Sequence, residues 1–180
     1  MKKFILTILC VVSVSFTLSA QQKYSTKTGV INFEASVPSF EEVKAKNENV
    51  SAILKDDGTF ASLALMKGFR FKVALMEEHF NENYAESSKY PKTTFRGKIK
   101  DFDVSQLSEV EKTFTVSGTV NMHGTDKEIE VPVSIKKDGE ALVLTTNFIL
   151  KPSDFNIEIP KVVSSKIAEE INVSASYRLN

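Results

Sequence analysis

Apolar side chains at every second position dominate this sequence, and that alternation is the feature that most limits its fold. Charged or small polar residues separate the apolar ones within each run. Because successive side chains of a strand point to opposite faces of a sheet, each run predicts a strand with one apolar and one wetter face. The runs are 31–37, 69–75, 95–99, 114–122, 129–135, 142–150 and 171–179.

Turn-forming residues separate several of these runs. Asp56-Asp57-Gly58, His123-Gly124-Thr125-Asp126 and Lys137-Asp138-Gly139 are short segments of the kind that join neighbouring antiparallel strands. The sequence therefore predicts an antiparallel, mostly β protein.

Two segments interrupt the alternation. Residues 76–90 end before Pro91, and a helix at their start would place Met76, Phe80 and Tyr84 on one face. Residues 164–170, just before the last run, predict a turn of helix. We therefore expect an all-β fold with a short helix or two.

About eight strands can hide their apolar faces in a two-sheet sandwich or in a closed barrel. A barrel removes the exposed sheet edges, and one of this size can be filled by side chains or can hold one small ligand. The chain has 13 Phe, many of them on the apolar faces of the runs. This composition favours a barrel with room inside, and a solid core packed by the same rings is the alternative.

The first twenty residues have the pattern of a secretory signal peptide. Lys2 and Lys3 precede an apolar stretch that ends near Ala20, and the stretch is short for a membrane span. We expect cleavage near Ala20, which removes Cys10, the only cysteine. The remaining domain, residues 21–180, would then fold without disulfides in a bacterial periplasm or outside the cell.

Charge and motifs argue against several function classes. The chain has 23 Lys+Arg and 23 Asp+Glu, so no net positive field attracts nucleic acid. It contains neither a phosphate-binding glycine loop nor a Gly-x-Ser-x-Gly motif, and we expect no enzyme activity, catalytic residue, cofactor or metal. A metal-assisted hydrolase that uses His79 with Glu78 and Glu82 is the enzymatic alternative.

Three short segments, in order, resemble the YceI-like family. The first is His79–Tyr84 followed by KYPKTTF at 89–95, and the second is the hairpin FTVSGTVNMHGT at 114–125. The third is KPSDFNI at 151–157. Typical members also carry a histidine in the first strand, which the corresponding segment 31–50 lacks.

The resemblance implies a lipocalin-like antiparallel barrel that carries an isoprenoid or fatty-acid-like lipid in its interior. A homodimer and transient membrane contact are compatible with that function. The polar head group would remain at the cavity mouth, near Lys92, Lys151 or Lys161. The predicted ligand-binding side chains are Phe33, Phe69, Phe71, Val73, Phe95, Phe114, Val116, Met122, Phe148 and Phe155.

Overall fold

The computed structural model describes residues 22–180, so the signal peptide predicted at 1–20 lies outside the described residues. The strands are β1 (Lys23–Ser36), β2 (Lys44–Lys55), β3 (Thr59–Leu65), β4 (Arg70–Phe71), β5 (Lys92–Ile99), β6 (Lys112–Met122), β7 (Thr125–Asp138), β8 (Ala141–Leu150) and β9 (Ile167–Leu179). The helical segments are η1 (Met66–Gly68), α1 (Ala74–His79), the π-helical η2 (Phe80–Tyr84), η3 (Val104–Gln106) and η4 (Pro152–Phe155).

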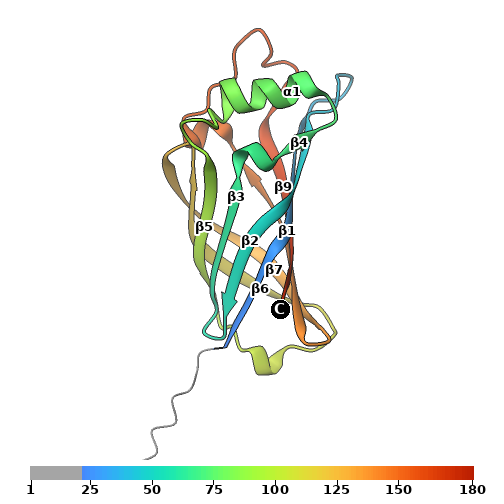
Figure 1. Cartoon of the computed structure of the whole chain (residues 1–180), viewed down its shortest axis with the longest axis vertical. Helices are drawn as coiled ribbons and strands as arrows, with labels where there is room; N and C mark the ends of the chain where they lie inside the picture. The colour runs from blue at the N-terminus through green and yellow to red at the C-terminus, as the bar shows by residue number, and fades with distance from the viewer. Residues whose placement is uncertain (1–21) are drawn as a thin grey trace, which may run out of the picture.

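The strands close into a ring. Their hydrogen-bonded order is β1-β9-β8-β7-β6-β5-β3-β2, and the pairing of β1 with β2 joins the two ends of this series. Neighbouring strands are antiparallel throughout. The predicted antiparallel barrel of about eight strands is confirmed, and β4 is an extra strand on the outer end of β2. Figure 1 shows α1 lying across the upper end of this barrel.

The strand predicted at 69–75 is wrong for most of its length. Only Arg70 and Phe71 form a paired strand, opposite Lys46 and Ala45 of β2. From Ala74 the chain turns into α1, whose sequence ALMEEH is rich in good helix formers. The helix predicted from Met76 is confirmed by α1 and η2.

The helical turn predicted at 164–170 is also wrong. Residues 161–166 form turns, and β9 already begins at Ile167, which pairs with Ser36 of β1. This pairing gives the backbone N–H and C=O groups at the start of β9 hydrogen-bond partners, which a short isolated helix would largely lack. Strands β2 and β3 were not among the predicted runs, because several of their inward positions carry small residues such as Ala52, Ser62 and Ala64.

The lower half of the barrel is a packed core. Its fully buried side chains come from many strands, and Leu107 from the η3 segment, 4 % exposed, closes the lower end. Phe102 of the same segment lies against Phe114, with ring centroids 5.9 Å apart. The buried aliphatic residues of this core include Leu54, Ile135, Leu142 and Leu179.

Two glycines face each other where β5 meets β6. Gly97 pairs with Gly118, and the ring of Phe95 lies across the space that their missing side chains leave. A Cβ atom at position 118 would lie 2.3 Å from the carbonyl oxygen of Arg96 and 2.8 Å from Cζ of Phe95. The absence of side chains at both positions therefore lets the Phe95 ring approach the barrel wall closely.

We predict that Gly118→Ala lowers the free energy of unfolding by about 1–3 kcal/mol, the usual cost of overpacking. Urea denaturation followed by circular dichroism measures this change. Ser117→Ala, an exposed neighbour on the same strand, is the control and should stay within about 0.5 kcal/mol of the unmodified protein. Equal stability of the two variants would contradict the packing argument.

Candidate functional site

The upper half of the barrel encloses a cavity of about 500 Å³. This volume is in the usual range of roughly 300–1,000 Å³ for small-molecule sites. Most of the lining side chains are apolar, and they come from the inward faces of the strands, from α1 and η2, and from the segment that joins β8 to β9. The barrel is therefore solid at one end and hollow at the other.

One wall of the cavity is aromatic. Phe33, Phe69, Phe71 and Phe80 form a cluster whose rings meet at tilted or edge-on angles, with the centroids of Phe71 and Phe80 5.2 Å apart. Their positions follow from β1, β4 and η2, which meet beneath the upper end of the barrel. The wall formed by β7 and β8 is aliphatic and aromatic, with Ile129, Val131, Phe148 and Leu150 among its lining residues.

Phe60, Phe95 and Tyr177 form an aromatic cluster on the floor of the cavity. The centroid of Phe60 lies 5.5 Å from that of Tyr177 and 6.0 Å from that of Phe95. The Tyr177 ring lies over Gly29, where a Cβ atom would come within 2.5 Å of it. Burial raises the pKa of Tyr177 above its ordinary value.

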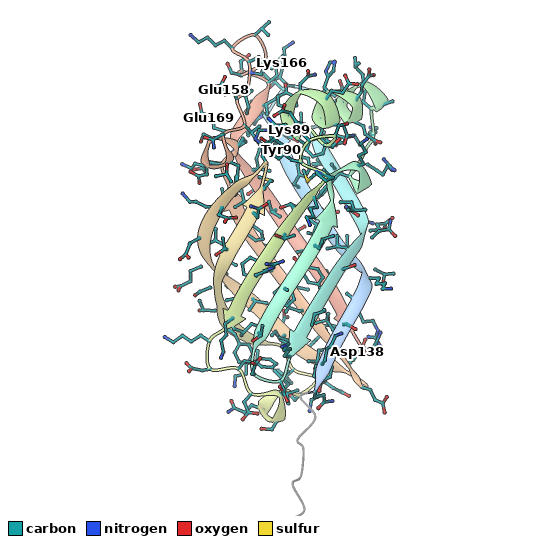
Figure 2. All side chains as sticks on the ribbon, turned by 60° about the vertical axis from the view of Figure 1, so that its left-hand side comes forward. Lys89, Tyr90, Asp138, Glu158, Lys166 and Glu169 are labelled. Atoms are coloured by element: carbon teal, nitrogen blue, oxygen red, sulfur yellow. The ribbon has the colours of Figure 1, made fainter. Side chains whose placement is uncertain are left out.

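The mouth of the cavity lies between three segments: residues 37–43, the α1–η2 helix and residues 151–166. Glu41, His79 and Lys166 contribute a carboxylate, an imidazole and an ammonium group to its lining. Figure 2 shows Lys166 at this end of the barrel and Asp138 at the opposite end. Acidic and basic side chains therefore lie at the mouth, where the end of an apolar ligand would be exposed to water.

His123 holds two of the segments around this end together. It lies in the turn between β6 and β7, and its Nε2 is 2.7 Å from Glu86 Oε2, just after η2. Its Nδ1 is 3.1 Å from the carbonyl oxygen of Phe155 in η4, and its ring centroid lies 4.3 Å from that of Tyr90. Each ring nitrogen of His123 therefore faces an oxygen that accepts hydrogen bonds, one from each segment.

Seven of the ten predicted side chains line the cavity: Phe33, Phe69, Phe71, Phe95, Val116, Met122 and Phe148. Their contact with a ligand stays a prediction.

Three predicted side chains lie outside the lining. Val73 precedes α1, where the chain leaves the barrel wall. Phe114 is buried beside Phe102, and Phe155 is fully buried in η4. Alternation identifies which side chains point inward, but it does not tell how far along the barrel axis each one lies.

Sequence reasoning also missed part of the lining. The sequence pattern could have identified Phe80 and Tyr84, because they share the predicted apolar helix face with Met76. No pattern identified residues 157–166, because an irregular segment reaches the mouth only through its tertiary contacts.

None of the lysines expected near a head group, Lys92, Lys151 and Lys161, lines the cavity. Lys151 pairs instead with Glu170 at 3.1 Å. Lys166, which the sequence did not single out, is in the lining.

Within residues 22–180, no group of three or more His, Cys, Asp or Glu side chains is arranged to hold a metal ion. His79 stands at the cavity mouth without such partners, and this arrangement gives the hydrolase alternative no support. In the same part of the chain, no helix has the length and apolar character needed to cross a membrane.

The model of the YceI-like domain family matches residues 12–179. The chain belongs to the YceI-like family. A search of curated protein sequences gives no match for this YceI-like protein. Its family membership agrees with the resemblance of the three short sequence segments.

Solved structures share the fold. A polyisoprenoid-binding domain from Saccharophagus degradans, implicated in plant cell wall breakdown, has a TM-score of 0.75 at 13 % identity, covering 88 % of this chain and 97 % of its own. Burkholderia cenocepacia BcnA has a TM-score of 0.70 at 16 % identity, with coverage of 84 % and 96 %. The Campylobacter jejuni YceI protein has a TM-score of 0.52 at 16 % identity, with coverage of 99 % and 98 %.

We predict that His123→Phe loosens the upper end of the barrel. The substitution keeps a ring beside Tyr90 but removes both hydrogen bonds, so the free energy of unfolding should fall by about 1–3 kcal/mol. Amide hydrogen exchange should accelerate in residues 80–90 and 151–157. Lys127→Ala, which removes an exposed ion pair with Asp154, is the control, with an expected loss of about 1 kcal/mol or less. Unchanged exchange in both segments would show that His123 does not hold them.

Proposed function

We propose that this YceI-like protein is an exported, non-catalytic carrier of a long amphiphile, either an isoprenoid or a fatty-acid-like lipid. The observation that carries the proposal is the apolar cavity above a packed floor, with its mouth at one end of the barrel. A site with this composition binds by enclosing apolar surface. It requires no nucleophile, metal or cofactor.

The energy of such binding comes from removing the ligand chain from water. Each methylene that leaves water contributes about 0.8 kcal/mol, and the aromatic and aliphatic walls supply the contacts. Ordering the ligand and the loops around the mouth offsets part of this gain, so the net affinity is smaller than the sum.

The relatives support the lipid class. The Saccharophagus degradans domain is described as polyisoprenoid-binding, and it shares this barrel over most of both chains. Export is inferred from the basic and apolar pattern of residues 1–20. A lipid carrier outside the cytoplasm would shield its ligand while the ligand moves between membranes.

The rim of the mouth carries apolar side chains that face solvent. Phe40, Leu75 and Val162 are 46 %, 57 % and 82 % exposed, and each comes from a different segment of the rim. Their sequence neighbours Met76 and Val163 line the cavity. We propose that this rim contacts a membrane transiently, so that the ligand exchanges without crossing open water.

A pair of tryptophan substitutions on β7 tests the cavity. The chain has no Trp of its own. Val131 lines the cavity, whereas the side chain of Glu130 points to the outer face. Val131→Trp should weaken the binding of a fluorescent fatty acid about tenfold, since displacing roughly two methylenes costs that factor. Glu130→Trp should bind as the unmodified protein does.

Native mass spectrometry of the same proteins, purified without detergent, gives a second measurement. A co-purified lipid that is abundant in the unmodified protein and in Glu130→Trp, but less abundant in Val131→Trp, agrees with carriage in the cavity. A bare polypeptide mass together with no fatty-acid binding would favour a domain without a ligand. Circular dichroism must show that all three proteins are folded.

We predict that the double substitution Leu75→Asp and Val162→Asp slows the transfer of a bound fluorescent fatty acid to phosphatidylcholine vesicles at least about fivefold. Charged side chains at the rim oppose its insertion among lipid tails. Val110→Asp is the control, because Val110 is 76 % exposed but lies near the closed end of the barrel. Equal transfer rates for all three proteins would exclude the rim as the exchange surface.

A further inference from the structure

The cavity has a closed end, and the aromatic cluster on its floor marks where it stops. Phe60, Phe95 and Tyr177 come from β3, β5 and β9, and all three line the cavity. The next inward pair towards the end of β9, Leu142 and Leu179, is at most 1 % exposed and belongs to the packed core. A ligand chain therefore ends at the rings, because close packing leaves it no room beyond them.

Glycines in the barrel wall keep two of these rings in place. The Tyr177 ring lies over Gly29, where a Cβ atom would come within 2.5 Å of Cδ1 of the ring. The Phe95 ring lies over Gly97 and Gly118, where Cβ atoms would come within 2.7 and 2.8 Å of its Cζ. Since the rings fill the recesses that the glycines leave, they cannot swing aside without losing these contacts. The floor is therefore a fixed stop.

The depth of the cavity follows from β9. The residues of this strand that line the cavity run from Tyr177 at the floor to Ile167, next to Lys166 at the mouth. At about 3.3 Å per residue and a strand tilt of about 40°, this stretch covers roughly 25 Å along the barrel axis. An extended hydrocarbon chain advances roughly 1.3 Å per carbon at the usual C–C bond length, so about 20 carbons span this depth.

The volume of the cavity sets a similar limit independently. The cavity encloses about 500 Å³. A methylene group occupies slightly less space than the roughly 30 Å³ that a water molecule takes up in the liquid, so about 18 carbons fill the cavity. A phospholipid with two such chains would need about twice this volume, and most of a long polyprenyl chain would remain outside.

We propose that the aromatic floor sets the length of the ligand, and that the protein carries a single-chain amphiphile of about 16–20 carbons, such as a fatty acid or an isoprenoid of about four units. This inference rests on the proposed carrier function. The chain end lies at the floor and the head group at the mouth. Carbons beyond this length stay in water and add little to the affinity.

A series of saturated fatty acids, from decanoic to docosanoic acid, tests the limit by displacement of the fluorescent probe N-phenyl-1-naphthylamine. We expect the affinity to rise several-fold with each added pair of carbons up to octadecanoic acid, and to stay within about twofold from there to docosanoic acid. An affinity that keeps rising several-fold per pair of carbons through docosanoic acid would overturn the inference.

A substitution one inward position above Tyr177 should raise the floor. Ala175 lines the cavity there, and Ala175→Phe fills about 5 Å of its depth, since two strand residues cover that distance along the axis. The affinity should then level off near tetradecanoic acid. Ser176→Phe is the matched control, because Ser176 is exposed on the opposite face of β9, and its limit should stay at octadecanoic acid. Circular dichroism checks that both variants fold.

Native mass spectrometry of the unmodified protein, purified without detergent, measures the length without any substitution. A co-purified single-chain lipid of the proposed length supports the inference even if Ala175→Phe does not fold. A two-chain phospholipid, or a polyprenyl lipid of about eight units or more, would overturn it.

The outcomes separate the inference from the function on which it rests. If the fatty acids displace the probe but folded Ala175→Phe levels off at the same length as Ser176→Phe, the protein binds chains and the floor does not limit them. If neither the probe nor any fatty acid binds and no lipid co-purifies, the carrier function fails and the inference fails with it.

Discussion

The pairing of β1 with β2 is the constraint on which the rest of the structure depends. It joins the first strand to the last members of the sheet and turns an open series of strands into a ring without free edges. The register between β1 and β2 shifts on both sides of Gly29. The same glycine lets the Tyr177 ring lie against the wall, so the seam that closes the barrel also supports the floor of its cavity.

The barrel divides its interior into a part that stabilises the fold and a part that remains open. Below the floor, side chains such as Leu54, Ile135 and Leu179 are completely buried and supply the close packing that a cavity cannot. Above the floor, the cavity separates the apolar side chains of opposite walls, so they make no van der Waals contacts with one another. A ligand chain in the cavity would restore these contacts, so the open half gains stability on binding.

The upper end of the barrel is held by specific polar contacts, because it has little core of its own. His123 connects the turn after η2 to η4, and Lys127 and Lys151 pair with Asp154 and Glu170 on either side of the β8–β9 connection. These contacts position the segments that shape the mouth. The apolar side chains of the rim can then face solvent, since the polar contacts rather than their burial keep the rim in place.

The sequence by itself determined the class of fold and many of the inward-facing residues, because the alternation of a strand is a local property of two neighbouring positions. It also indicated the helix face of Met76, Phe80 and Tyr84. Only the tertiary structure decided the depth of each side chain along the barrel axis, which separates Phe114 in the core from Phe95 at the floor. It also placed Ser62 and Tyr177, from strands that are far apart in the chain, in the lining of one cavity, since no local pattern records which strands meet when a sheet closes on itself.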